Sequence, residues 1–137
     1  MIIMSVDRGK ARTGIAYSDK SESFAFPKQV ITEYNEDRLV QKVADKAREL
    51  GAELIVGGLP KNMDGSESFR AEKTYAFAEM LKNELEMEII FVDERLSTVQ
   101  AYTYLNITDF NGKKRKKVID ALSAQIILQS FLDKIRK

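Results

Sequence analysis

Short apolar runs alternate with stretches of helical periodicity along this chain. The runs that have the length and composition of buried strands are residues 2–6, 54–56 and 89–92. Two weaker segments, residues 15–17 and a stretch within 23–31, have the composition of flanking strands, and Pro27 favours an edge position for the second. The pattern therefore predicts five strands, three of them buried.

Helical periodicity follows several of these runs. Asn35 is a suitable N-cap, apolar residues then recur at helical spacing, and Gly51 is a natural residue to end that helix. Further helices are predicted at residues 71–85, from Ser97, which forms a capping-box pattern with Gln100, and from about residue 117 to residue 135.

Strands that alternate with helices favour right-handed crossovers and parallel pairing of the three buried strands. The early strands can add an antiparallel flank through hairpins. We therefore expect an α/β protein with one five-stranded mixed sheet and helices on both faces. Because 137 residues is an ordinary size for one domain, we expect residues 1–137 to form a single domain.

Composition narrows the chemistry that this fold can carry. The chain has no histidine and no cysteine, which excludes a Ser-His-Asp triad, disulfides and thiolate metal sites. No apolar run is long enough to cross a bilayer, and no secretory leader pattern is present, so we expect a cytoplasmic protein without membrane association. Carboxylates, lysines and a hard metal ion remain as the tools for hydrolysis.

Carboxylates at three places in the chain are candidates for such a metal site. Asp7 ends the first strand, and Asp93-Glu94 ends the last buried strand, so parallel pairing brings them to one edge of the sheet. Asp120 lies on the apolar face of the last helix, where a carboxylate is costly without a partner or a metal ion. Oxygen ligands favour Mg²⁺ or Mn²⁺, and such an ion supports phosphodiester hydrolysis without histidine.

Each acid also has a purely structural interpretation. Asp7 can be a turn residue, Asp93-Glu94-Arg95 a solvated ion-pair cluster, and Asp120 a first-turn residue that complements the helix dipole. The residues alone do not separate Asp93 from Glu94 as the metal ligand.

The net charge is only +1, so any attraction to a polyanion has to come from local basic residues. The candidate nucleic-acid contacts are Lys61, Asn62, Arg95, Lys113, Lys114, Arg115, Lys116 and Lys117. The run from Lys113 to Lys117 follows the turn residues Asn111 and Gly112, so a solvated loop is the competing interpretation.

Several motifs in a fixed order resemble one known family over nearly the whole chain. They are Val6-Asp7-x-Gly9, Thr13-Gly14-Ile15-Ala16, Val56-Gly57-Gly58-Leu59-Pro60-Lys61-Asn62-Met63-Asp64-Gly65-Ser66, Arg70-Ala71-Glu72-Lys73, Phe77-Ala78, Asp93-Glu94-Arg95-Leu96-Ser97-Thr98, Asp120-Ala121-Leu122-Ser123-Ala124 and Ile127-Leu128-Gln129. The chain thereby resembles the YqgF/RuvX family of candidate Holliday junction resolvases and pre-16S rRNA nucleases. Arg8 and Phe69 depart from the usual pattern, and neither position belongs to the acidic set.

The resemblance implies a ribonuclease H-like fold with Asp7, Glu94 and Asp120 as a catalytic triad that binds Mg²⁺ or Mn²⁺. It also implies endonucleolytic processing of the 5′ end of the small-subunit rRNA precursor. One alternative is a junction resolvase, which needs a symmetric dimer to cut two strands of branched DNA, so monomer and homodimer both remain open. Others are a non-catalytic RNA-binding module and an actin-like ATPase, which would need a second such domain.

Overall fold

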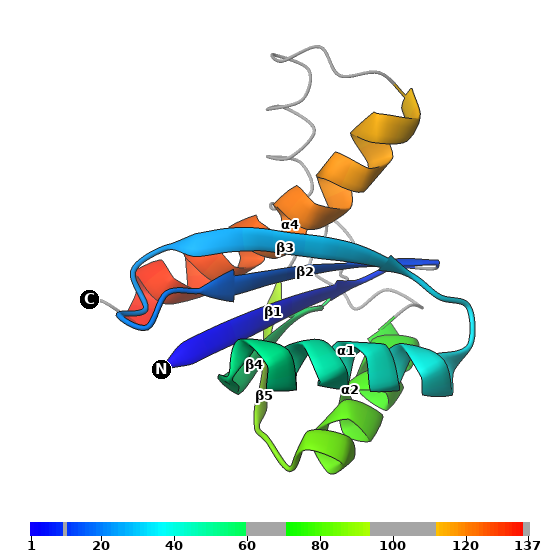
Figure 1. The fold of residues 1–137 in the computed structure, drawn as a ribbon, viewed down its shortest axis with the longest axis horizontal. Helices are drawn as coiled ribbons and strands as arrows, with labels where there is room; N and C mark the ends of the chain where they lie inside the picture. The colour runs from blue at the N-terminus through cyan, green and yellow to red at the C-terminus, as the bar shows by residue number, and fades with distance from the viewer. Residues whose placement is uncertain (10, 60–70, 94–111, 136–137) are drawn as a thin grey trace.

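The fold is an α/β arrangement built on one sheet (Figure 1). The computed structural model describes residues 1–9, 11–59, 71–93 and 112–135, and for residues 112–121 it describes the backbone alone. The strands are β1 (Ile2–Arg8), β2 (Arg12–Ser18), β3 (Ala25–Thr32), β4 (Ala52–Leu59) and β5 (Ile89–Asp93). The sheet order is β3-β2-β1-β4-β5, with antiparallel pairing from β3 to β1 and parallel pairing from β1 to β5. This confirms the predicted five-stranded mixed sheet.

Helices cover both faces of this sheet, as predicted. Helices α1 (Glu36–Leu50) and α2 (Ala71–Leu85) lie on one face, and α4 (Gly112–Ile135) crosses the other (Figure 1). The N-terminal turns of α4, coloured amber, stand away from the sheet in this view. Within the part of the chain that the structure describes, no helix is both long and apolar enough to span a bilayer.

Two apolar clusters fill the space between the sheet and its helices, and they record which way each strand residue points. On the α1 and α2 face, the cluster includes Met4, Val6, Ile15, Ile55, Val43, Phe77 and Leu81. On the α4 face, it includes Ile3, Ala16, Leu54, Val56, Ile127, Leu128 and Leu132. Successive residues of β1 and β4 therefore alternate between the two clusters, as a strand buried on both faces requires.

The ends of α1 follow from local chemistry. The Asn35 side chain accepts a hydrogen bond of 3.0 Å from the Arg38 N–H, which satisfies one of the free donors of the first turn. Gly51 ends the helix with a φ of 71°, in the left-handed region that favours glycine. Both boundaries match the sequence prediction.

Two other boundaries differ from the prediction. The strand predicted at residues 54–56 is longer in the structure, because Gly57 and Gly58 pair with β5 and extend β4 to Leu59. Helix α4 begins at Gly112 rather than near residue 117, so the basic run is helical and not a loop. Lysine and arginine are good helix formers, which accounts for the earlier start. The helix expected from Ser97 lies outside the described residues.

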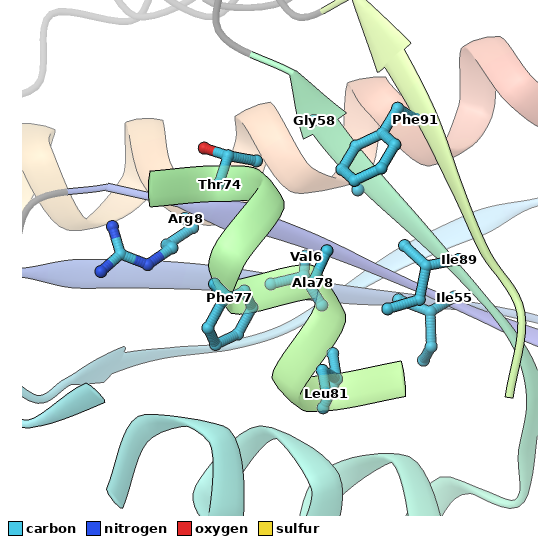
Figure 2. A pocket seen from close by; sticks show the side chains of 11 residues that line it. Val6, Arg8, Ile55, Gly58, Thr74, Phe77, Ala78, Leu81, Ile89 and Phe91 are labelled. Atoms are coloured by element: carbon cyan, nitrogen blue, oxygen red, sulfur yellow. The ribbon is translucent and has the colours of Figure 1, made fainter. Parts of the chain in front are cut away.

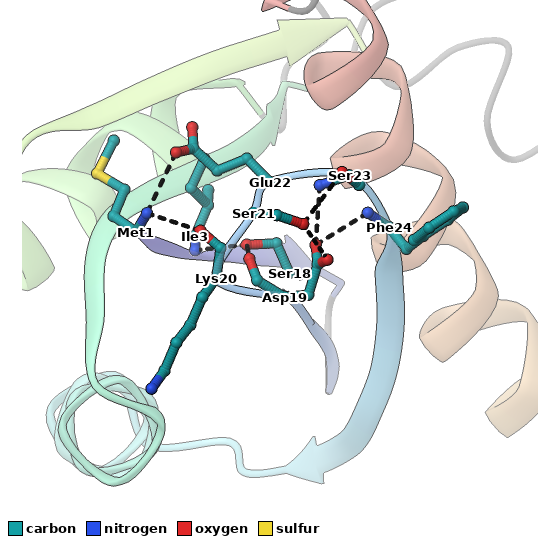
Figure 3. A network of polar contacts seen from close by, with 9 residues as sticks. All are labelled: Met1, Ile3, Ser18, Asp19, Lys20, Ser21, Glu22, Ser23 and Phe24. Carbon is teal, nitrogen blue, oxygen red and sulfur yellow. Dashed lines mark hydrogen bonds and ion pairs between the residues drawn. The ribbon is translucent and has the colours of Figure 1, made fainter.

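The turn between β2 and β3 closes the end of the sheet that is remote from Asp7 (Figure 3). One carboxylate oxygen of Asp19 accepts hydrogen bonds from the backbone N–H groups of Ser23 and Phe24, at 2.8 and 3.0 Å. The Ser21 hydroxyl donates to the other oxygen. The Ser21 hydroxyl first, and then these backbone groups, lower the pKa of Asp19 from its ordinary 3.8 to about 2.

Candidate active site

Asp7 is the penultimate residue of β1, where it pairs with Gly14 of β2 and is half-buried. Alternate residues of a strand share a face, so Asp7 lies on the same face as Ile3 and Ser5. Ile3 belongs to the apolar cluster beneath α4, and Ser5 contacts α4 directly. Asp7 is therefore on the α4 face of the sheet, at the carboxyl end of its strand.

The Ser5 hydroxyl fixes one turn of α4 against β1. Its Oγ is fully buried and donates a hydrogen bond of 2.7 Å to the carbonyl of Ala124. Further along α4, the Gln129 side chain accepts a hydrogen bond from the backbone N–H of Ala25. Ala25 pairs with Ser18 of β2, and the Ser18 hydroxyl accepts a hydrogen bond from Ile3, near the amino-terminal end of β1. Later residues of α4 therefore lie beside earlier residues of β1, so the helix runs opposite to the strand (Figure 1).

This antiparallel arrangement directs the turn that carries Asp120 toward the end of the sheet that carries Asp7. Asp120 precedes Ala124 by four residues, a rise of about 6 Å along a helix. Asp7 follows Ser5 by two residues, an advance of about 6.6 Å along a strand. Both steps start from the same hydrogen bond and run in the same direction, so the turn that carries Asp120 lies on the Asp7 side of the contact between Ser5 and Ala124.

Asp93 and Glu94 have different standing. Asp93 is the exposed last residue of β5. It lies two residues after Phe91 and therefore on the same face of the strand, where the Phe91 ring contacts Tyr75 of α2 edge-on with centroids 5.1 Å apart. Asp93 is therefore on the α2 face, opposite to Asp7. Glu94 lies outside the described residues. Of the two acids that the sequence left unresolved, the structure describes only Asp93, and Asp93 does not share the face of Asp7.

A metal site built from these acids would use oxygen donors alone, which suits Mg²⁺ or Mn²⁺. Among the residues that the structure describes, no group of three or more acidic residues could by itself hold a metal ion. The carboxylates of Glu94 and Asp120 do not belong to that described set, whereas Asp7 does. The position of Asp7 and the course of α4 fit a site of this kind.

Arg8 points to the opposite face from Asp7 and ties the end of β1 to both helices there. Its guanidinium donates to both carboxylate oxygens of Glu36 in the first turn of α1, and one of these hydrogen bonds measures 3.1 Å. The same guanidinium lies 5.7 Å from the ring centroid of Phe77 in α2. Only 13% of the Arg8 side chain is exposed. This contact holds the strand end beside Asp7.

The tight turn after Arg8 supports the same strand end. The Gly9 N–H donates a hydrogen bond of 2.9 Å to the carbonyl of Arg12. A Cβ at Gly9 would lie 2.6 Å from that backbone oxygen, so a side chain there would force the turn open. The contact of Ser5 with α4 and the Arg8–Glu36 pair could not be predicted from the sequence, since no spacing rule joins residues so far apart.

A small cavity lies beneath α2, on the Arg8 side of the sheet (Figure 2). It measures about 20 Å³, and the residues that line it are Val6, Arg8, Ile55, Gly57, Gly58, Thr74, Phe77, Ala78, Leu81, Ile89 and Phe91. A space of this size holds about one water molecule and cannot accept a nucleotide or a base. This cavity is therefore too small to be the candidate site.

The predicted nucleic-acid contacts divide into two groups. Lys113 to Lys117 occupy the first turns of α4, for which the structure describes the backbone alone. They therefore precede Asp120 on the helix whose course leads to the Asp7 edge. Lys61, Asn62 and Arg95 lie outside the described residues.

Comparisons with known proteins agree with this architecture. A model of the RuvX family, described as Holliday junction resolvase, matches residues 1–134. A protein of Halothermothrix orenii, named as a candidate pre-16S rRNA nuclease, is 41% identical over 133 residues that cover 97% of this chain and 95% of the relative. A protein of Clostridium tetani with the same name is 38% identical over 135 residues, which cover 98% of each chain.

The fold has a counterpart among solved structures. Thermus thermophilus RuvC in complex with a Holliday junction substrate superposes with a TM-score of 0.63 over 100% of this chain and 97% of the other. The sequence identity is 11%, so this likeness concerns the fold, and it confirms the predicted ribonuclease H-like arrangement. Together with the match over residues 1–134, these findings show that the chain belongs to the RuvX family of nucleases.

Proposed function

We propose that this chain is a divalent-metal-dependent endonuclease that processes the 5′ end of the pre-16S rRNA. The observation that carries the proposal is the Ser5–Ala124 hydrogen bond, which supports a site because Asp7 and the Asp120 turn of α4 lie on the same side of it and α4 covers the face of Asp7. The choice of substrate is supported by relatives about 40% identical that are named as candidate pre-16S rRNA nucleases.

Asp7, Glu94 and Asp120 would hold Mg²⁺ or Mn²⁺ through their carboxylate oxygens. When bound, such an ion lowers the pKa of a water ligand and neutralises charge on the phosphate under attack. Glu94 is preferred to Asp93 because Asp93 lies on the opposite face from Asp7. The chain offers no histidine to act as an alternative base, so the carboxylates carry this chemistry.

A second set of residues, most of them basic, binds and orients the nucleic acid. Lys113 to Lys117 form the first turns of α4, and there we assign them to the phosphate backbone. Lys61, Asn62 and Arg95 are assigned to the same role from the sequence. Arg8 has a different task, because its guanidinium is engaged with Glu36 and Phe77 on the far face, where it holds the strand end that presents Asp7.

A second candidate is a junction resolvase that acts on branched DNA. The description of the family model and the fold shared with a RuvC–junction complex favour it. This activity requires two active sites in a symmetric dimer, because two strands have to be cut. A monomeric enzyme that cuts RNA would exclude it.

The test is cleavage of two labelled substrates, a pre-16S rRNA 5′ end and a four-way DNA junction, with Mg²⁺, Mn²⁺ or chelator. Wild type is compared with Glu94→Gln, and light scattering gives the oligomeric state in the same buffer. We expect metal-dependent cleavage of the RNA that Glu94→Gln abolishes. Cleavage of the junction alone by a dimer would instead assign the resolvase activity. Binding of RNA without cleavage under any metal condition would overturn the endonuclease proposal.

A further inference from the structure

We propose that Ser5 is a positioning residue that sets the spacing between Asp7 and Asp120, and that it thereby tunes the affinity of the site for its metal ion. The inference rests on the proposed metal site. Among the described residues, the hydrogen bond that Ser5 makes to α4 goes to the backbone and not to a carboxylate.

The geometry of the hydrogen bond makes Ser5 a suitable spacer. Ser5 is fully buried between Ile3 and Asp7 on the α4 face, and its Oγ donates 2.7 Å to the Ala124 carbonyl. An interior helix carbonyl already accepts a bond from the N–H four residues later, so the hydroxyl adds a second donor to the same oxygen. The contact therefore fixes the rotation and the distance of this helical turn relative to β1.

The position of the bond along α4 matters as much as its strength. Gln125 and Gln129 tie the helix to the backbone of Ala25 and Ser23, at the end of the sheet remote from Asp7. Along α4, the contact of Ser5 with Ala124 comes between those glutamines and the amino-terminal turns, which stand away from the sheet in Figure 1. Loss of the hydroxyl would loosen the turn that carries Asp120, while Gln125 and Gln129 continue to hold the later turns of α4.

The structure offers a matched control in Ser18. Its side chain is also buried, at 1% exposure, and its Oγ accepts a hydrogen bond of 2.8 Å from the Ile3 N–H. Ser18 lies at the opposite end of β1 from Asp7, and its hydroxyl donates to the carbonyl of Asp19. Ser18→Ala removes a buried hydroxyl without affecting the contact between Ser5 and α4.

The first measurement is the Mn²⁺ affinity of the metal-free protein, by calorimetry without nucleic acid, for wild type, Ser5→Ala, Ser18→Ala and Asp7→Asn. We expect Ser5→Ala to weaken binding roughly 10- to 100-fold, the usual range for residues that orient metal ligands, and Ser18→Ala to leave it unchanged. The second is hydrogen exchange of the same metal-free proteins. Ser5→Ala should accelerate exchange in the amino-terminal half of α4, and Ser18→Ala should not.

The outcomes separate this inference from the function on which it rests. Mn²⁺ binding by wild type that does not depend on Asp7 would overturn the proposed metal site itself. Binding that is lost in Asp7→Asn but equal in Ser5→Ala and wild type would overturn the role of Ser5 alone. If Ser5→Ala does not fold, Ser5→Cys keeps the shape and weakens the donor, and the same comparison decides the question.

Discussion

Asp7 and Asp93 lie on opposite faces of one sheet, although each stands at the carboxyl end of a parallel strand. Asp7 lies two residues after Ser5 and on its face, where Ser5 contacts α4, whereas Asp93 lies two residues after Phe91 and on its face, where Phe91 contacts α2. The register confirms that the two strand ends are close to level, since Val6 pairs with Gly57, and Gly57 pairs with Phe91. A shared edge therefore does not make a shared site, and only one face can hold a cation beside Asp7.

The placement of Asp93 predicts that substitutions of the adjacent acids Asp93 and Glu94 affect cleavage differently. We expect the rate of metal-dependent cleavage by Asp93→Asn to stay within about twofold of wild type, because a side chain on the α2 face is not a ligand of the proposed metal site. Glu94→Gln should lower the cleavage rate by at least about a hundredfold, as removal of a metal ligand does. Single-turnover cleavage of a labelled rRNA precursor measures both variants, and the reverse order of effects would place Asp93 in the site.

The contact between Arg8 and Glu36 should stabilise the folded protein. We expect a double-mutant cycle with Arg8→Met and Glu36→Gln to give a coupling energy of about 1 kcal/mol, the upper end for ion pairs of this exposure. The Arg8 side chain is 13% exposed and Glu36 is 37% exposed, so solvent screens part of the attraction. Urea denaturation measures the four proteins.

The pair formed by Lys46 and Glu49 on the surface of α1 is the matched control. These side chains are 27% and 55% exposed, so their coupling should be near zero to a few tenths of a kcal/mol. Equal coupling in the two pairs would show that the burial of Arg8 adds nothing to its attraction to Glu36.

The Asp19 turn should lose its contribution to stability in acid. The pKa of Asp19 is about 2 in the folded protein and 3.8 ordinarily, so the charged form stabilises the fold above pH 3.8. That contribution falls as the pH drops from 3.8 through 2. Asp19→Ala should therefore be less stable than wild type at pH 7, and the gap should narrow at pH 2. Thermal unfolding at both pH values measures the gap, and a constant gap would contradict the role of the ionised carboxylate.

The basic turns of α4 should govern how nucleic-acid binding depends on salt. Replacement of Lys113, Lys114, Arg115, Lys116 and Lys117 by glutamine keeps good helix formers and removes their charge. We expect weaker binding and a flatter salt dependence, by roughly 0.7 in log-log slope for each lost contact to single-stranded RNA. Replacement of Lys42 and Lys46 on the opposite face should leave the slope unchanged. An unchanged slope in the α4 variant would show that these residues make no phosphate contacts.

Sequence patterns were sufficient to predict the strands of the sheet and their alternation with helices along the chain. Apolar runs and helical spacing depend on local chemistry, so the five strands, the caps of α1 and the two covered faces could be predicted. The end of β4 could not, because glycine has a weak strand preference, and Gly57 and Gly58 are held in the strand by pairing with β5. The start of α4 was missed because turn residues before a basic run also suggest a loop.

The site could be predicted only as far as its edge. Parallel strands bring their carboxyl ends together, which placed Asp7 and Asp93-Glu94 at one edge without saying which face each acid occupies. The face depends on the strand register and on which helix packs on which side, and both are tertiary properties. The contacts of Ser5 with Ala124 and of Arg8 with Glu36 join residues far apart in the chain, so no local pattern announces them.

The most direct test of the metal-dependent nuclease is cleavage and binding of the labelled rRNA precursor by wild type and Asp7→Asn in the same Mg²⁺ buffer. The substitution removes a carboxylate ligand but no basic contact, so we expect cleavage to disappear while the dissociation constant for the RNA stays within about threefold. Normal cleavage by Asp7→Asn would contradict the proposed mechanism.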